Sequence, residues 1–475
     1  MMLRKCVILL VAAVMLSCLS ACGVPVNQTL PVFEDATVIR SAWWCPEPTE
    51  ENYQQYKDAG LNTLTLVNHN FWQQNDFWNS DAAMLLDRTQ REGYYIGTPN
   101  GFTDKTQTDK SLELAKKLGL SVILSEGSYL FDSIGQETNV YTDHTLNYGD
   151  YTDTIVGVFS GDEPSADKIA DRAKHIAAAE QAFPNAPYFC NLYPMYASAA
   201  EVLKTNTYDE YLQRYGEEFL SKQNGPKLIS VDYYPYQSGT ELWWLQNFKK
   251  VAEAAKTYDA DIHYYVQSCL HENGNYFEQS ESDLRLQVQV ALCFGASAYS
   301  YYLYDTAGTV TSGYEQGLVM RDDTPSPFYG YAQEVNAEVA AMEDALLHYD
   351  YVSTKVLSGS EMDYQTGAYS ILSKKEPDFS DCVVATGATA GNRALVSLFR
   401  DKAGNEAYYV VDFYDHGSLE REEGTSVTLQ LPNMKQAAVY GTTAKLSGDI
   451  RPVENGVFTM ELQPGEGCLI VPFVK

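Results

Sequence analysis

Acidic side chains stand where short apolar runs of the chain end, and carboxylates at such points could move protons. Asp162 and Glu163 follow the run TIVGVFS and precede Pro164, Asp232 lies in SVDYYPY, and Glu272 follows IHYYVQSCLH. A carboxyl group held in apolar surroundings keeps its proton near neutral pH, and a second, ionised carboxylate then serves as base or nucleophile. The sequence therefore indicates acid/base chemistry by carboxylates.

Each of these carboxylates also has a structural interpretation. Asp162 or Glu163 could cap a helix whose first turn holds Pro164, because acids there interact favourably with the helix dipole. Asp232 could bond loop amides, and Glu272 could be a solvated loop acid. For Asp162 and Glu163 the two interpretations are compatible, since a capping acid can also face a cleft.

Aromatic rings and amides accompany the carboxylates at the same run ends. Pyranose rings offer apolar C–H faces to aromatic planes and hydroxyls to amide, imidazole and carboxylate groups, so this mixture favours a glycan ligand. Strand periodicity requires about half of these aromatics to pack inside the protein instead. The predicted substrate-binding residues are Trp43, Trp44, His69, Asn70, Glu126, Asp162, Asn191, Tyr193, Tyr234, Gln267, Tyr302 and Asp305.

The elements that must position these residues alternate between short β-branched or aromatic runs and longer helix-like stretches, which favours parallel strands with crossover helices. Eight such units within residues 36–349 predict a (β/α)8 TIM barrel, in which strand ends and the following loops form the active site. The predicted strands are residues 38–44, 61–67, 120–126, 154–160, 187–193, 228–234, 262–268 and 297–304. An apolar piece at 94–98, in the long excursion 68–108, could be a ninth strand or a loop.

Beyond Tyr349 the pattern changes to short, alternating runs such as ALVSLFR and CLIVPFV, separated by Gly, Asn, Asp or Pro. This pattern is typical of an antiparallel β-sandwich. We therefore expect an α/β chain in which the TIM barrel is followed by a C-terminal sandwich at 350–475.

These features together resemble the TIM-barrel glycoside hydrolases of the large retaining clan, especially its β-galactosidase-like members. The resemblance is carried by the acids after the fourth strand, the aromatic eighth strand, the stretch GLVMRDDTPSPFYGYAQEVNAEV and the C-terminal sandwich. It implies that Glu163 is the acid/base that protonates the glycosidic oxygen. The clan's nucleophile is a glutamate at the end of strand seven, where this chain has Gln267.

The sequence therefore leaves several candidates for the second carboxylate. Glu272, five residues after Gln267, and Asp232 are the leading candidates, and Glu126 and Asp305 are further ones. The prediction is a glycoside hydrolase-like protein that cleaves a glycosidic bond of an oligosaccharide or polysaccharide. The alternative is a non-catalytic glycan-binding or scaffold protein with a degenerate active site.

The first residues read as an export signal. Residues 1–21 place Arg4 and Lys5 before an apolar run that is too short to span a membrane, and the run ends in Leu-Ser-Ala-Cys22. This end resembles a bacterial lipobox, so Cys22 is predicted to be lipidated, with 22–35 as a tether. The expected location is outside the cytoplasm, anchored to a bacterial membrane by lipid.

Composition excludes several other classes. The 475 residues carry 63 acidic and 33 basic side chains, and a net charge of -30 disfavours nucleic acid as a partner. Zinc-finger spacing, HExxH, phosphate loops, GxGxxG and GxSxG are absent, so neither a metal nor a cofactor is predicted. The cysteines have no CxxC pair, and we expect mostly free thiols. The sequence does not determine an oligomeric state.

Overall fold

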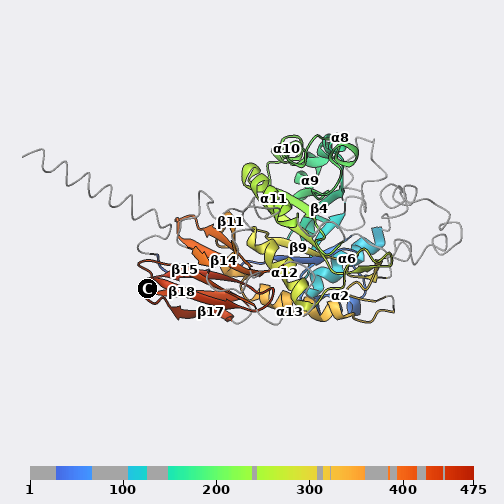
Figure 1. Ribbon diagram of the computed structural model, residues 1–475. Coiled ribbons are helices and arrows are strands. Elements are labelled where there is room, and N and C mark those ends of the chain that lie inside the picture. Colours follow the sequence, from blue (N-terminus) through green and yellow to red (C-terminus); the bar gives the residue numbers. More distant parts are fainter. Residues whose placement is uncertain are drawn as a thin grey trace, which may run out of the picture. The chain divides into compact units, whose positions relative to one another are not determined.

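The computed structural model describes residues 28–66, 105–125, 148–237, 243–306, 314–320, 322–358, 383–385, 393–414, 424–441 and 444–474 (Figure 1). They form two compact units. One consists of Ile39–Leu284 and Ala296–Ala337, and the other of the residues up to Val38, Arg285–Gly295 and Glu338–Lys475. The predicted ranges, 36–349 and 350–475, differ from this division mainly because Arg285–Gly295 and Glu338–Tyr349 group with the C-terminal strands.

The first unit contains a TIM barrel, as the sequence predicts. Its strands form one parallel sheet in the order β1-β9-β7-β6-β5-β4-β3-β2. The Asn62 N–H, just before β2, donates to the Arg40 carbonyl in β1 at 3.0 Å, which brings the two ends of the sheet together. The strands are β1 Ile39–Ala42, β2 Thr63–Thr65, β3 Ser121–Ser125, β4 Ile155–Asp162, β5 Tyr188–Leu192, β6 Leu228–Asp232, β7 Asp261–Gln267 and β9 Ala298–Tyr302.

Each of the eight predicted runs contains or overlaps one of these strands. Most strand residues are buried on both faces, because helices cover the outside and side chains fill the inside. In β6, for example, every residue from Leu228 to Asp232 is buried. A separate two-stranded antiparallel sheet pairs β8 (Leu270–His271), which follows β7, with β10 (Tyr314–Glu315), which follows β9. The possible ninth strand at 94–98 lies outside the described residues.

The first helix of the barrel begins at a capping side chain. Thr49 is the N-cap of α2, and its hydroxyl accepts a hydrogen bond from the Asn52 N–H at 3.1 Å. Between β4 and β5, α8 and α9 are separated by a 3-10 turn at Ala173–His175. The helices are α2 Glu50–Asp58, α6 Lys105–Leu118, α8 Ala166–Arg172, α9 Ile176–Ala182, α10 Tyr208–Glu218, α11 Trp244–Tyr258, α12 Glu281–Cys293, α13 Pro327–Ala340 and α14 Glu343–Leu346.

The second unit contains the antiparallel β-sandwich. A six-stranded sheet has the order β11-β13-β14-β19-β16-β17, and a three-stranded sheet has the order β12-β15-β18. Alternate side chains of both sheets, such as Val396, Val410 and Leu429, share one apolar core. The strands are β11 Asp350–Ser358, β12 Val383–Ala385, β13 Arg393–Arg400, β14 Glu406–Phe413, β15 Thr425–Gln430, β16 Gln436–Gly441, β17 Ala444–Pro452, β18 Val457–Leu462 and β19 Gly467–Phe473.

The described cysteines are buried thiols. Cys45, Cys190, Cys269, Cys293 and Cys468 form no disulfide with one another, in line with the expectation of mostly free thiols, while Cys382 lies outside the described residues. Among the described helices, none combines the length and the apolar character needed to cross a bilayer.

Candidate active site

Every second residue of a barrel strand faces inward, and the character of these side chains changes from the amino to the carboxyl end of the strand. On β6 the inward residues are Leu228, Ser230 and Asp232, which pass from apolar at the amino end to acidic at the carboxyl end. On β1 the same alternation gives Ile39, Ser41 and Trp43. The barrel therefore has an apolar lower interior, a hydroxyl-rich middle, and carboxylates and aromatic rings at the carboxyl ends, where TIM-barrel active sites lie.

Asn191 joins two carboxylates at these carboxyl ends. Its Nδ2 group donates to an Asp162 carboxylate oxygen at 3.0 Å and to an Asp232 carboxylate oxygen at 3.2 Å. Asp162 ends β4, Asn191 lies in β5 and Asp232 ends β6, so three neighbouring strands contribute. The structure thus brings together three of the residues predicted from strand ends.

Asp232 is the more deeply buried member of this carboxylate pair. It is 6% exposed, whereas Asp162 is exposed. Burial, with a smaller contribution from the Asp162 carboxylate, raises the pKa of Asp232 to about 8. Asp232 therefore holds its proton at neutral pH and could donate it.

Glu163 lies beside this pair, at a strained backbone position. Its φ of 43° is in the left-handed region, which non-glycine residues rarely adopt and which is concentrated at functional sites. The Glu163 N–H donates to the Asn191 carbonyl at 2.8 Å, which fixes this turn against β5. Its side chain is half-buried.

The charges of these carboxylates raise the pKa values of nearby tyrosines. The pKa of Tyr196 is raised first by burial of its hydroxyl and then by the charges of Asp232 and Glu163. For Tyr265, the pKa is raised by burial and then by Asp162 and Asp232. Tyr196 is nevertheless 39% exposed, so it lies within reach of these charges and also forms part of the protein surface.

Several predicted aromatic residues pack together at the carboxyl ends of β1, β6 and β9. The Tyr302 ring lies 5.4 Å from that of Tyr234 and 6.3 Å from that of Trp44, measured between centroids. Trp43 contacts Tyr265 edge-on at 5.5 Å. Trp44 is buried, whereas Trp43 and Tyr302 are only partly buried and present part of their surface outward.

Gln267 is held by the main chain of Tyr236, and Glu272 is exposed. The Gln267 side chain is fully buried, accepts from the Tyr236 N–H at 3.1 Å and donates to the Tyr236 carbonyl at 3.0 Å. The oxygen and the NH2 group of its amide therefore each bond a main-chain group of Tyr236. Glu272 lies in the exposed turn after β8, in line with the alternative of a solvated loop acid.

The remaining predicted residues have other positions. Asp305 is 6% exposed, and its main chain pairs with that of Val319. The pKa of the nearby Cys45 thiol is raised to about 12, mainly by burial and to a smaller extent by the charge of Asp305. Tyr193 is half-buried after β5. Outside the described residues lie His69, Asn70, Glu126 and Cys22.

Sequence reasoning missed the polar middle of the barrel. The residues there are Ser41, Thr65, Ser230, His263 and Ser300, all buried. The available signal was period-two alternation, because Ser41, Ser230 and Ser300 each precede a predicted strand-end residue by two positions and must share its face.

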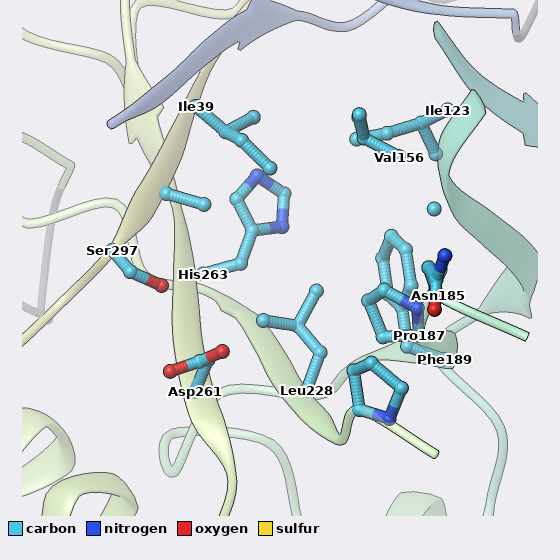
Figure 2. A pocket seen from close by; sticks show the side chains of 13 residues that line it. Ile39, Ile123, Val156, Asn185, Pro187, Phe189, Leu228, Asp261, His263 and Ser297 are labelled. Carbon is cyan, nitrogen blue, oxygen red and sulfur yellow. The ribbon is translucent and has the colours of Figure 1, made fainter. Parts of the chain in front are cut away.

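A pocket opens at the opposite end of the barrel. Its lining includes Ile39, Leu228, Asp261 and Ala298, which are the first residues of their strands, and Figure 2 shows the His263 imidazole among these side chains. The amino ends of TIM-barrel strands generally serve stability rather than catalysis. Within the described part of the chain, no group of three or more His, Cys, Asp or Glu side chains could hold a metal ion.

The fold and this site define a (β/α)8-barrel protein with a C-terminal β-sandwich and a carboxylate cluster at the ends of β4, β5 and β6. No protein-family model and no curated protein sequence matches the chain. Among solved structures, a GH42 β-galactosidase from G. stearothermophilus is similar at 9% identity and a TM-score of 0.51, covering 94% of this chain and 100% of that one. At this identity the similarity establishes the fold alone.

Other similar structures match less well. A cold-adapted β-galactosidase from Rahnella sp. has 10% identity and a TM-score of 0.41, covering 70% of this chain and 59% of that one. A GH5_18 protein from Streptomyces cattleya, solved with GlcNAc, has 10% identity and a TM-score of 0.37, covering 64% and 80%.

Proposed function

We propose that this protein hydrolyses a glycosidic bond by carboxylate acid/base catalysis, with Asp232 and Glu163 as the pair. The carrying observation is that Asn191 holds Asp232 beside Asp162, next to Glu163, at the carboxyl ends of neighbouring barrel strands. The partly exposed rings of Trp43, Tyr302 and Tyr196 suit the apolar faces of a sugar. The shared fold with a β-galactosidase adds support to a glycan substrate.

In this proposal Asp232 protonates the leaving oxygen, because burial keeps its carboxyl neutral near pH 7. Glu163 is the second carboxylate, which stabilises or attacks the developing positive charge at the anomeric carbon or activates water. This assignment differs from the one that the resemblance implies, in which Glu163 is the acid/base.

Leaving-group chemistry tests the assignment. Wild type, Asp232→Asn and Glu163→Gln are compared on oligosaccharides and on aryl glycosides with poor and good leaving groups. Loss of a general acid costs about 10²–10⁴-fold with poor leaving groups and much less with good ones, since the latter depart without a proton. We expect this selective rescue in Asp232→Asn and a loss on all substrates in Glu163→Gln. The opposite pattern would return the acid role to Glu163, and unchanged turnover in both variants would remove the pair from the mechanism.

A glycan-binding protein without turnover is the second candidate. The observation that favours it is that Gln267 stands at the end of β7, and that its amide forms hydrogen bonds with the Tyr236 main chain. Calorimetric binding of an oligosaccharide by wild type and both variants, with no product formed by any of them, would select this function.

We further propose that the protein is a surface lipoprotein anchored through Cys22. The support is the order of basic, apolar and small residues before this cysteine. In the native host, Cys22→Ser should move the protein out of the membrane fraction and abolish incorporation of labelled fatty acid, and Cys45→Ser should change neither. Retention of Cys22→Ser in the membrane would refute the anchor.

A further inference from the structure

A continuous chain of side-chain hydrogen bonds crosses the barrel interior and ends on the candidate carboxylates. From the far wall it runs from the Thr65 hydroxyl to Ser41 at 3.2 Å and from Ser41 to Ser300. Ser300 contacts His263 Nε2 at 2.7 Å, and His263 Nδ1 contacts the Ser230 hydroxyl at 2.8 Å. Members from β1, β2, β7 and β9 are thereby connected to β6.

The last links reach the active site. The Ser230 hydroxyl donates to Asn191 Oδ1 at 3.0 Å, and Asn191 Nδ2 donates to Asp162 and Asp232. His263, Ser230 and Asn191 are at most 4% exposed, so bulk water does not compete for these bonds.

The carboxylates set the direction of every bond in this chain. Asp162 and Asp232 both accept from the Asn191 NH2 group, the neutral Asp232 carboxyl through its carbonyl oxygen, so Asn191 Oδ1 is turned toward Ser230. The Ser230 hydroxyl donates its one hydrogen to Asn191 and can therefore only accept from His263. His263 Nδ1 must then carry a proton. Burial lowers the pKa of His263 to about 3, and a neutral imidazole has one N–H, so Nε2 accepts from Ser300.

The rest of the chain agrees with this direction. Ser300 donates to His263 and therefore accepts from Ser41, which in turn accepts from Thr65. Each hydroxyl donates once, and no bond has two donors or two acceptors.

We propose that His263 is a positioning residue for the carboxylates: as the neutral Nδ1–H tautomer it fixes the Asn191 amide, through Ser230, with its NH2 toward Asp162 and Asp232. The catalytic consequence rests on the proposed function, because the same carboxylates are involved. If the Asn191 amide turned over, its oxygen would face the Asp162 carboxylate oxygen, and two acceptors would repel each other. His263 acts only through other residues and does not touch substrate.

The tautomer is tested without any assay of activity. In protein labelled with ¹⁵N-histidine, the His263 signals are identified by their loss in His263→Gln. We expect the two-bond N–H pattern of the Nδ1–H tautomer, unchanged from about pH 5 to 8. An Nε2–H tautomer or an imidazolium would overturn the proposal even if the protein is a glycosidase.

The positioning effect is tested by removing and restoring one hydroxyl. Ser230→Ala should lower kcat by up to about 10²-fold with KM nearly unchanged, because a small misplacement of a catalytic group has this effect, and Ser230→Thr should recover most of kcat. Ser397→Ala is the matched control. Ser397 is equally buried, and its hydroxyl bonds Thr354 in the sandwich unit.

A titration of Asp232 covers the case in which no substrate is turned over. Followed by ¹³C NMR of carboxyl-labelled aspartate, the pKa of Asp232 should rise in Ser230→Ala, because the Asn191 hydrogen bond lowers it in the wild type. It should return in Ser230→Thr and stay unchanged in Ser397→Ala. An unchanged pKa in Ser230→Ala would refute the positioning role, whereas absent turnover with a shifted pKa would refute only the proposed function.

Discussion

Two buried ionisable residues within the barrel, Asp232 and His263, are both driven toward their neutral forms. Burial raises the pKa of the acid to about 8 and lowers the pKa of the imidazole to about 3, because in each case the charged form loses its hydration. The acid therefore carries a proton that it can donate, and the imidazole keeps one donor and one acceptor. The same physical cause thus gives the two residues different roles.

Asp232 should make the protein less stable as the pH rises. Its folded-state pKa lies above the ordinary value of 3.8, so between about pH 4 and 8 the native state binds more protons than the unfolded chain. The contribution of Asp232 to the free energy of unfolding is complete below about pH 4. It is lost as the pH rises through 8, by up to about 1.4 kcal/mol per pH unit. Asp232→Asn should therefore unfold at higher urea concentration than wild type at pH 8, with a flatter dependence on pH.

The control for this measurement is Asp153→Asn, since Asp153 is an exposed acid. It should reproduce the wild-type slope. Identical slopes in Asp232→Asn and wild type would show that Asp232 titrates normally.

Gln267 can be tested as a main-chain clamp. Gln267→Glu replaces the NH2 that donates to the Tyr236 carbonyl by an oxygen, so an ionised side chain would face another acceptor. We expect a loss of about 1–3 kcal/mol in unfolding free energy at pH 8, and recovery toward pH 4, where a protonated carboxyl again offers one donor and one acceptor. Gln267→Leu should be destabilised equally at both pH values, and a Gln267→Glu variant as stable as wild type at pH 8 would contradict the clamp.

At the scale of elements, one buried amide ties helices to the barrel wall. In α13, Asn336 Oδ1 accepts from the Tyr299 and Tyr301 hydroxyls at 2.7 and 2.9 Å, and Nδ2 donates to the Ala59 carbonyl at 2.7 Å. Ala59 follows α2, and Gly60 adopts φ 76° against the Asn336 side chain, where an added Cβ would lie 2.6 Å from Asn336 Cβ. The last helix of the barrel is thereby fastened to its first helix and its eighth strand.

Asn336→Ala should leave all three of these buried groups without their partner. The expected loss is about 3 kcal/mol or more in unfolding free energy, measured by urea denaturation. Gln333→Ala is the comparison variant, because Gln333 also donates to a carbonyl at the end of α2 but is exposed. Its cost should stay within about 0.5 kcal/mol, and equal losses in both variants would contradict the assigned role of burial.

The elements themselves were predictable where side-chain period and burial agree. The eight barrel strands are apolar runs bounded by capping and turn residues, and Thr49 is the N-cap of α2. Strand β17 of the sandwich is not recognisable from its own sequence. That sequence, AKLSGDIRP, lacks apolar alternation, and the strand is specified by its partner β16 instead.

At the scale of the whole molecule, the dominant property is the net charge of -30. Like charges repel in the compact state, and salt screens that repulsion within about 8 Å at physiological ionic strength. We expect the Tm at pH 7 to rise between about 10 and 200 mM NaCl, measured by calorimetry. Near the isoelectric point of about 4.5 the gain should vanish, and a Tm at pH 7 that falls with salt would contradict the electrostatic account.

The sequence by itself determined the barrel, the sandwich and the strand ends at which acids and aromatics collect, because period-two burial and turn chemistry are local properties. It also indicated Asp162, Asn191 and Asp232, since each stands at a strand end. Only the tertiary structure decided that Asn191 bridges the two aspartates, that Gln267 serves the Tyr236 main chain, and that Glu272 stays in solvent. These outcomes depend on distances between strands far apart in the chain, and the pKa of Asp232 follows from burial that exists only once the barrel has closed.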